Sequence, residues 1–167
     1  MLASRAGIAL AFVLIACTVC VAAEGWRTYR NSRFGATAQF PANWAMDPEP
    51  DNNDGRSITS PDKRAKIVIA GIRAEIDAPD DDIALRAKPN EGEVITYQKR
   101  AKGWIVVSGT RGDTIFYRKS ILTCGGSIWN DLSIEYPSAD QEKYDALVKR
   151  VSASLRGGKG YDANDCR

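Results

Sequence analysis

Alternating apolar and polar positions predict that much of this chain forms short strands. Residues 34–40 place two phenylalanines and two alanines on one side, with glycine, threonine and glutamine on the other, as in a half-buried strand. Residues 66–72 are apolar at almost every position, which predicts a central strand covered on both faces. Residues 26–30 interleave aromatic residues with arginine, and we expect them to form a first strand or an arm lying on the sheet.

Four further strands are predicted in the second half of the chain, at residues 94–99, 104–108, 114–122 and 127–136. Glycine-containing turns separate these strands, and their spacing is typical of an antiparallel meander. The proline-rich and asparagine-rich residues 47–56 are predicted to be a loop.

Two segments have helical character. Residues 80–88 begin with three aspartates, which favours a short helix with a negatively charged first turn over a metal site. Near the C-terminus, Ser138 and Gln141 have the spacing of a capping box. The apolar residues that follow form one helical face: Tyr144, Leu147, Val148, Val151 and Leu155. Together these elements predict an α+β fold, a mostly antiparallel sheet of about six strands with a short middle helix and an amphipathic C-terminal helix packed on it.

The N-terminus has the pattern of a secretory signal peptide. A short basic start precedes the apolar residues 6–16, and small residues lead up to Ala23. We therefore expect a signal peptide at residues 1–23, cleavage after Ala23, a single domain at residues 24–157 and a polar tail at residues 158–167.

Two alternatives for this segment remain open. The residues ending at Cys17 resemble a bacterial lipobox, in which the cysteine would carry a lipid anchor. The uncharged residues 6–23 are also just long enough for an uncleaved membrane anchor. All three interpretations place the domain outside the cytoplasm, as a periplasmic or secreted protein, and cleavage after Ala23 would leave no stable membrane insertion.

Charge and composition exclude several classes of function. The chain has 23 Lys and Arg residues against 21 Asp and Glu residues, and losing Arg5 with the signal leaves 22 against 21. Such a balance predicts no overall attraction to nucleic acid or anionic lipid. The chain has no histidine, which excludes Ser-His-Asp catalysis, histidine general bases and histidine-ligated metals. We expect no cofactor and no catalytic residues.

The cysteine count depends on export. Cys17 and Cys20 leave with the signal, whereas Cys124 and Cys166 remain. Two cysteines in an oxidising compartment most simply form one disulfide, which would pin the polar tail to the domain. The alternative is two free thiols.

The polar loop offers a candidate partner-binding site at Asp51, Asn53, Asp54 and Arg56. Alternating oxygen-bearing side chains could instead form a weak calcium site, although the spacing departs from the EF-hand pattern. A solvated turn is the simplest interpretation of the same residues.

Two resemblances extend this picture. The segments Tyr-Arg-Asn-Ser-Arg-Phe-Gly (29–35), Phe-Pro (40–41) and Asp-Gly-Arg (54–56) resemble a group of exported alphaproteobacterial proteins that carries no known activity. More distantly, Phe34-Gly35, Pro41 and Trp44 are similar to the opening of PsbP-like and DcrB-like domains. That resemblance implies a sheet with a terminal helix, in domains that are mostly non-enzymatic accessory or binding modules of bacterial envelopes.

These observations predict a small exported, non-catalytic binding or accessory domain of the bacterial cell envelope, with an envelope protein or ligand as its partner. Two alternatives differ in class. One is a hydrolase of envelope glycans that uses carboxylates alone, which needs two carboxyl groups facing each other across a cleft. The other is a structural envelope-stress protein with no ligand.

Overall fold

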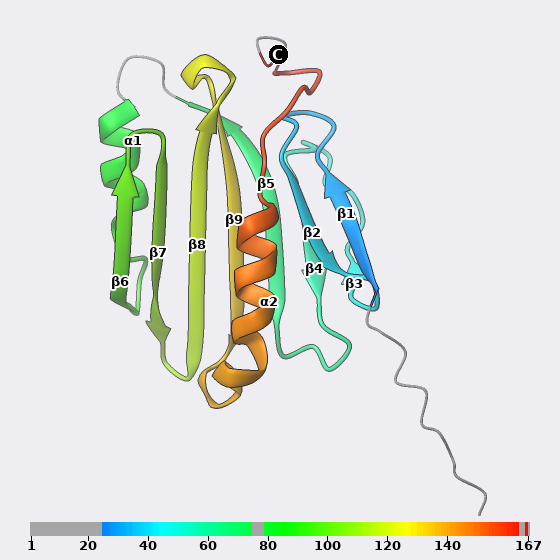
Figure 1. The fold of residues 1–167 in the computed structure, drawn as a ribbon, viewed down its shortest axis with the longest axis vertical. Coiled ribbons are helices and arrows are strands. Elements are labelled where there is room, and N and C mark those ends of the chain that lie inside the picture. Colours follow the sequence, from blue (N-terminus) through cyan, green and yellow to red (C-terminus); the bar gives the residue numbers. More distant parts are fainter. Residues whose placement is uncertain (1–24, 75–78, 164–165, 167) are drawn as a thin grey trace, which may run out of the picture.

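The computed structural model describes residues 25–74, 79–163 and 166. The predicted signal peptide, with Ala23 and the alternative lipid site Cys17, lies outside the described residues. An antiparallel seven-stranded sheet forms the body of the protein (Figure 1). Its strands, in spatial order, are β3 (Ala45–Met46), β4 (Gly55–Thr59), β5 (Lys66–Arg73), β9 (Ile128–Pro137), β8 (Thr114–Thr123), β7 (Trp104–Arg111) and β6 (Glu93–Ala101).

A separate hairpin precedes this sheet. It consists of β1 (Trp26–Arg30) and β2 (Thr37–Pro41), paired so that Tyr29 lies opposite Ala38. The alternation predicted for residues 34–40 is confirmed from Thr37 on, where Ala38 and Phe40 are fully buried, but the predicted strand is wrong at its start because residues 34–36 belong to the turn before β2. The expected arm is therefore a two-stranded ribbon packed on the larger sheet.

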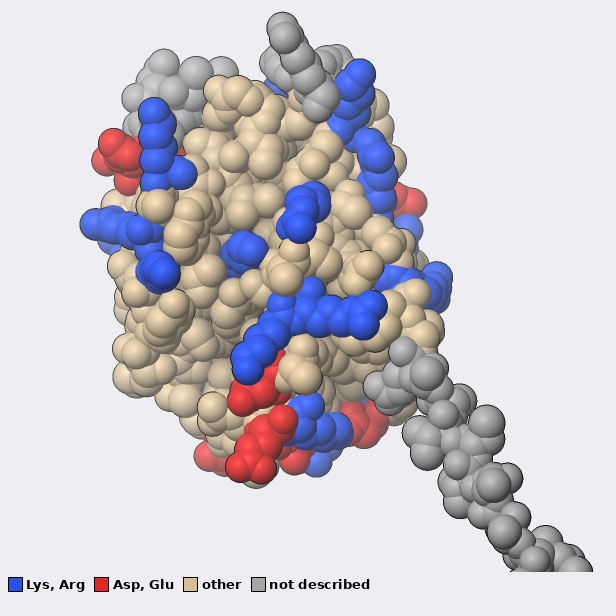
Figure 2. All heavy atoms as spheres, in the orientation of Figure 1, with Lys and Arg blue, Asp and Glu red and all other residues tan. Residues whose placement is uncertain are grey.

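Helix α2 (Gln141–Ser154) packs on the same face of the sheet as this hairpin (Figure 1). Its buried residues Tyr144 and Val151 meet a layer of sheet side chains from β4, β5 and β9. The principal apolar members of that layer are Ile58, Ile67, Ile69, Leu132 and Ile134. On the same face, strands β8, β7 and β6 follow β9 in the sheet order and extend away from the layer under α2. In space-filling form this face shows acidic side chains gathered at its lower end, where α2 begins (Figure 2).

Helix α1 (Pro79–Arg86) covers part of the opposite face. Its Ile83 packs with Ile105, Phe116 and Trp129, which point away from α2 because side chains alternate along each strand. Helix α1 covers only one end of this face, and the remainder is more open. No helix in the described part of the chain is long and apolar enough to cross a membrane.

The predicted meander of four strands is confirmed as β6 to β9: the first three strands are longer than expected, and β9 has the expected length but starts one residue later. The predicted loop at residues 47–56 is wrong at its end, because β4 begins at Gly55. An added side-chain carbon at Gly55 would collide with Ala70 on β5, so glycine permits a close strand pairing here. With β3, β4 and the hairpin included, the described chain has more strands than the expected six or so.

Two further local predictions are wrong. Strand β5 is fully covered on one face only, because Ile67 and Ile69 are buried while the other face is half-buried at Val68 and Ala70 and exposed at Ile72. The capping box is absent, since a 3₁₀ turn (Ser138–Asp140) precedes α2 and moves the helix start to Gln141. The preceding residue, Asp140, makes no side-chain cap and instead pairs with Arg64 at 3.0 Å.

The polar tail returns to the domain. Cys166 forms a disulfide with Cys124, the pairing expected from the cysteine count, and is buried against Phe34 and Ile128. The tail also makes backbone hydrogen bonds to the turn that follows β1, including one of 2.9 Å from the Asp162 N–H to the Arg33 carbonyl.

Candidate functional site

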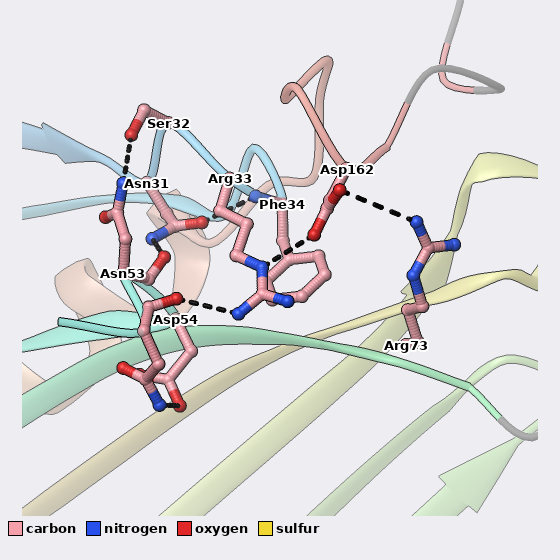
Figure 3. A network of polar contacts seen from close by, with 9 residues as sticks. Asn31, Ser32, Arg33, Phe34, Asn53, Asp54, Arg73 and Asp162 are labelled. Atoms are coloured by element: carbon pink, nitrogen blue, oxygen red, sulfur yellow. Dashed lines mark hydrogen bonds and ion pairs between the residues drawn. The ribbon is translucent and has the colours of Figure 1, made fainter. Parts of the chain in front are cut away.

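The polar loop proposed for partner binding is built into a structural network (Figure 3). The Asn53 amide donates to the Ser32 hydroxyl at 2.7 Å, and its backbone carbonyl accepts from Asn31 at 2.9 Å. The Asp54 carboxylate accepts from the Asn52 amide, and the Asp54 carbonyl accepts from the Gly71 N–H, each at 2.8 Å. These two loop residues therefore hold the loop against the turn after β1 and against β5.

The other two predicted loop residues, Arg56 and Asp51, differ in their exposure. Arg56 lies half-buried in β4, where its guanidinium pairs with Glu49 at 3.0 Å and donates to the Asp47 carbonyl at 2.6 Å. Asp51 is exposed at the tip of the loop. Of the four predicted site residues, Asp51 is the one most accessible to a partner.

Asn31 is the centre of this network. It is fully buried, donates to the Tyr29 hydroxyl at 3.2 Å and to the Asn53 carbonyl, and accepts from the Phe34 N–H at 2.6 Å. Nearby, Arg33 lies over the Phe34 ring at 4.7 Å and pairs with Asp162 of the tail at 2.7 Å (Figure 3). The Asn31 side chain thus connects the hairpin to the polar loop, and its neighbour Arg33 connects the hairpin to the tail.

Asn31→Ala is expected to lower the free energy of unfolding by about 2–3 kcal/mol, because it leaves the buried Phe34 N–H without an acceptor. Urea unfolding measures the effect. Ser32→Ala removes an exposed contact of the same network and should cost about 0.5 kcal/mol. Equal stability of the two variants would contradict a central role for Asn31.

A groove lies between α1 and the open face of the sheet, and we call it the α1 groove. It encloses about 290 Å³. Its floor is formed by β5, β7, β8 and β9, and its wall by α1 and the residues that follow it. The lining residues are Val68, Ala70, Leu85, Arg86, Lys88, Asn90, Ile105, Val107, Arg118, Ser120, Asp131, Leu132 and Ser133.

Arg86 fixes one end of the groove. Its guanidinium pairs with Asp131, donates to the Ser120 hydroxyl at 3.0 Å and lies 4.5 Å above the Trp129 ring. The Trp129 indole N–H in turn donates to Asp82 at 2.9 Å. Ion pair, hydrogen bonds and cation–π contact together hold α1 on the sheet and hold the guanidinium in place.

Arg118 is held from the other side of the groove. Its guanidinium pairs at 2.9 Å with Glu93, whose side chain is 2% exposed, and donates to the Lys88 carbonyl at 3.3 Å. Glu93 also accepts from the Asn90 N–H at 2.8 Å. Since a guanidinium has five N–H donors, both arginines keep donors for a further acceptor.

The chemistry of the α1 groove suits binding. Its lining carries three cations against the single carboxylate of Asp131, and small or apolar floor residues such as Val68, Ala70 and Ser133 lie between them. A partner with an apolar portion and an acidic group would match this combination.

A second hollow of about 610 Å³ lies beside the start of α2, between Trp26, Trp44 and Lys143. Its single carboxylate is Asp62. Hydrogen bonds from the Ser60 hydroxyl and the Arg64 N–H lower the pKa of Asp62 to about 2. A general acid needs a raised pKa, so Asp62 suits a fixed negative charge instead.

A third hollow contains the carboxylates of Asp140, Glu142 and Asp145. All of its lining residues come from the continuous segment 138–145, so no second element faces them. None of these three hollows therefore has the two opposed carboxylates that the glycan hydrolase alternative requires. Within the described residues, no group of three or more Cys, Asp and Glu side chains could hold a metal ion, including those of the polar loop.

Sequence reasoning did not find the α1 groove. Arg86 lies in the last turn of α1, and its partner Asp131 lies 45 residues further along the chain, so no local pattern connects them. The available signal was the mixture of serines and charges on one side of β8 and β9, at Arg118, Ser120 and Ser133, where a buried face would be apolar.

Comparisons with known proteins identify a fold. No family model matches the chain, and no curated protein matches it. LpqN, described as involved in cell envelope biogenesis of Mycobacterium tuberculosis, aligns over 79% of this chain and 91% of its own, with 13% identity and a TM-score of 0.49. The solution structure of cyanobacterial PsbP (CyanoP) from Synechocystis sp. PCC 6803 aligns over 83% of this chain and 95% of its own, with 8% identity and a TM-score of 0.56. The predicted fold class is therefore confirmed: the chain has a PsbP-like α+β fold.

Proposed function

We propose that this protein is a small exported, non-catalytic binding domain of the bacterial cell envelope, and that it holds its partner in the α1 groove. Export is supported by the signal-peptide pattern ending at Ala23 and by the Cys124–Cys166 disulfide, which is stable in an oxidising compartment. The resemblance to exported alphaproteobacterial proteins, which remains a prediction, supports the same location.

The observation that carries the proposal is the pair of fixed guanidinium groups beside a groove floor that is apolar in part, at residues such as Val68, Ile105 and Val107. Arg86 and Arg118 are each held by a carboxylate. Because their side chains are already ordered, little side-chain conformational entropy is lost when a partner binds. The non-catalytic part of the proposal is supported by the absence of histidine from the sequence and by the single carboxylate of the groove.

A groove-filling substitution tests this proposal. Ser133 lies half-buried on the groove floor, so Ser133→Tyr would occupy the groove without removing either arginine. In crosslinked envelope extracts, we expect the wild-type protein to capture a partner that Ser133→Tyr does not capture. The matched control is Ser57→Tyr, on the same side of the sheet and outside the groove lining, which should capture the partner normally.

The polar loop is the competing surface for the same partner. Asp51→Ala removes its most exposed carboxylate and leaves the Asn31 network intact. Loss of the partner with Asp51→Ala, together with normal capture by Ser133→Tyr, would assign binding to the loop and contradict the groove.

A further inference from the structure

The protein surface that carries α2 is rich in cations. We define the α2 face as the exposed surface of α2, the β1–β2 hairpin with the adjoining tail, and the side of β6, β7 and β8 that points the same way. Lys99 belongs to it because it shares a sheet side with Lys119, whose ammonium donates to the Ser152 carbonyl of α2 at 2.8 Å. Seven cations of this face are Arg30, Lys99, Lys119, Lys149, Arg150, Arg156 and Lys159, and the exposed Arg27 and Lys143 also lie on it.

Eight of the described cations lie in ion pairs, and others, such as Lys63, Lys66 and Lys88, lie in none. The described ion pairs involve Arg33, Arg56, Arg64, Arg73, Arg86, Arg111, Arg118 and Lys143. Among the described residues, none of the seven has a carboxylate within ion-pair distance, whereas Lys143, at the start of α2, pairs with Asp62 at 3.4 Å. Blue side chains accordingly spread over the middle of this face in Figure 2, and red ones gather at its lower end.

The near-neutral net charge therefore conceals a separation of charge. Carboxylates pair with Arg33 and Arg56 around the polar loop and with Arg86 and Arg118 at the α1 groove, whereas the seven α2-face cations have no ion pair. Burial and the neighbouring positive charge of Arg156 lower the pKa of Lys119, which lies on the α2 face.

Apolar side chains are exposed among these cations. Val94 is 62% exposed and Tyr97 is 52% exposed, and both point to the same side of the sheet as Lys99. Trp104, half-buried, lies on the same side of the neighbouring strand. Aromatic rings with a polar edge are favoured at the boundary between water and lipid.

We propose that the α2 face docks on the anionic phospholipid surface of a membrane. The seven unpaired cations are dispersed on both sides of α2, and no hollow described above contains more than one of them. A dispersed array of charges matches a plane of headgroup phosphates better than a discrete ligand, which needs converging groups in a hollow. Because the α1 groove lies on the opposite side of the sheet, it stays open to water, so this proposal goes beyond the proposed function and does not depend on it.

Vesicle sedimentation of the exported, disulfide-bonded protein tests the proposal. We expect binding to vesicles of phosphatidylcholine with phosphatidylglycerol, no binding to phosphatidylcholine alone, and weaker binding as the salt concentration rises. The double variant Lys99→Gln/Lys149→Gln removes two exposed cations and should weaken binding about 30-fold, at about 1 kcal/mol for each cation near an anionic surface.

The matched control is Lys63→Gln/Lys66→Gln, which removes the same charge from exposed positions at the β4–β5 turn. It should change vesicle binding by about two-fold or less, because these positions lie outside the α2 face. Equal weakening by both double variants would overturn the proposal. So would an absence of phosphatidylglycerol-dependent binding, and binding to an acidic polysaccharide without binding to vesicles would assign the face to that polymer instead.

Discussion

Replacing Cys124 and Cys166 together by alanine is expected to lower the free energy of unfolding by about 4 kcal/mol. The two cysteines are 42 residues apart, and a crosslink across such a separation removes a large part of the conformational entropy of the unfolded chain. Both residues remain in contact with the apolar cluster around Phe34 and Ile128, so alanine removes little packing beyond the two sulfur atoms.

Urea unfolding with and without a reductant measures this effect. The wild-type protein in reductant should unfold at nearly the same urea concentration as the double alanine variant, and the variant should not respond to the reductant. The single variant Cys166→Ala should match the double variant, because either substitution removes the whole crosslink. A stability loss below about 1 kcal/mol would show that the hydrogen bonds of the tail to Ser32 and Arg33 suffice to hold it.

The sequence was informative wherever a local repeat decided the structure. Alternation along a single strand placed Ala38 and Phe40 in the core correctly, because the side chains of a strand point to its two faces in turn. The meander from β6 to β9 was also predictable, since each of its connections is a tight turn with its own residue signature.

Local patterns failed where a neighbouring element decided the outcome. Asp54-Gly55-Arg56 has the composition of a turn, yet the close approach of Ala70 makes Gly55 part of a strand pair. Residues 66–72 are apolar enough for burial on both faces, but α1 packs over Trp129 of β9 and leaves its cross-strand neighbour Ile72 exposed. Neither outcome can be derived from the segment itself.

The sites follow the same division. The loop residues Asn53 and Asp54 were recognised as a polar cluster, but their partners Asn31, Ser32 and Gly71 come from distant parts of the chain, so their structural role was hidden. The separation of charge on the α2 face was equally hidden, because a net charge of one or two per chain carries no information about which faces hold the cations.

Trp129→Ala is expected to lower the free energy of unfolding by about 3–5 kcal/mol and to release α1 from the sheet. The Trp129 side chain is fully buried, fills the core between Ile105, Phe116 and α1, and is the surface on which the Arg86 guanidinium lies. Its removal leaves a cavity below α1 and also removes the indole donor to Asp82, so the helix loses packing and a charge-assisted hydrogen bond together.

Two measurements separate these contributions. Trp129→Phe keeps most of the ring volume but lacks the indole N–H, and should cost about 1–2 kcal/mol in urea unfolding. Hydrogen exchange should show faster exchange of the α1 amides in Trp129→Ala than in Trp129→Phe, with the α2 amides similar in both, because α2 packs on the other face. Unchanged α1 exchange in Trp129→Ala would mean that Ile83 and the polar contacts of Arg86 hold this helix without the tryptophan, and the α1 groove would then not depend on Trp129 for its wall.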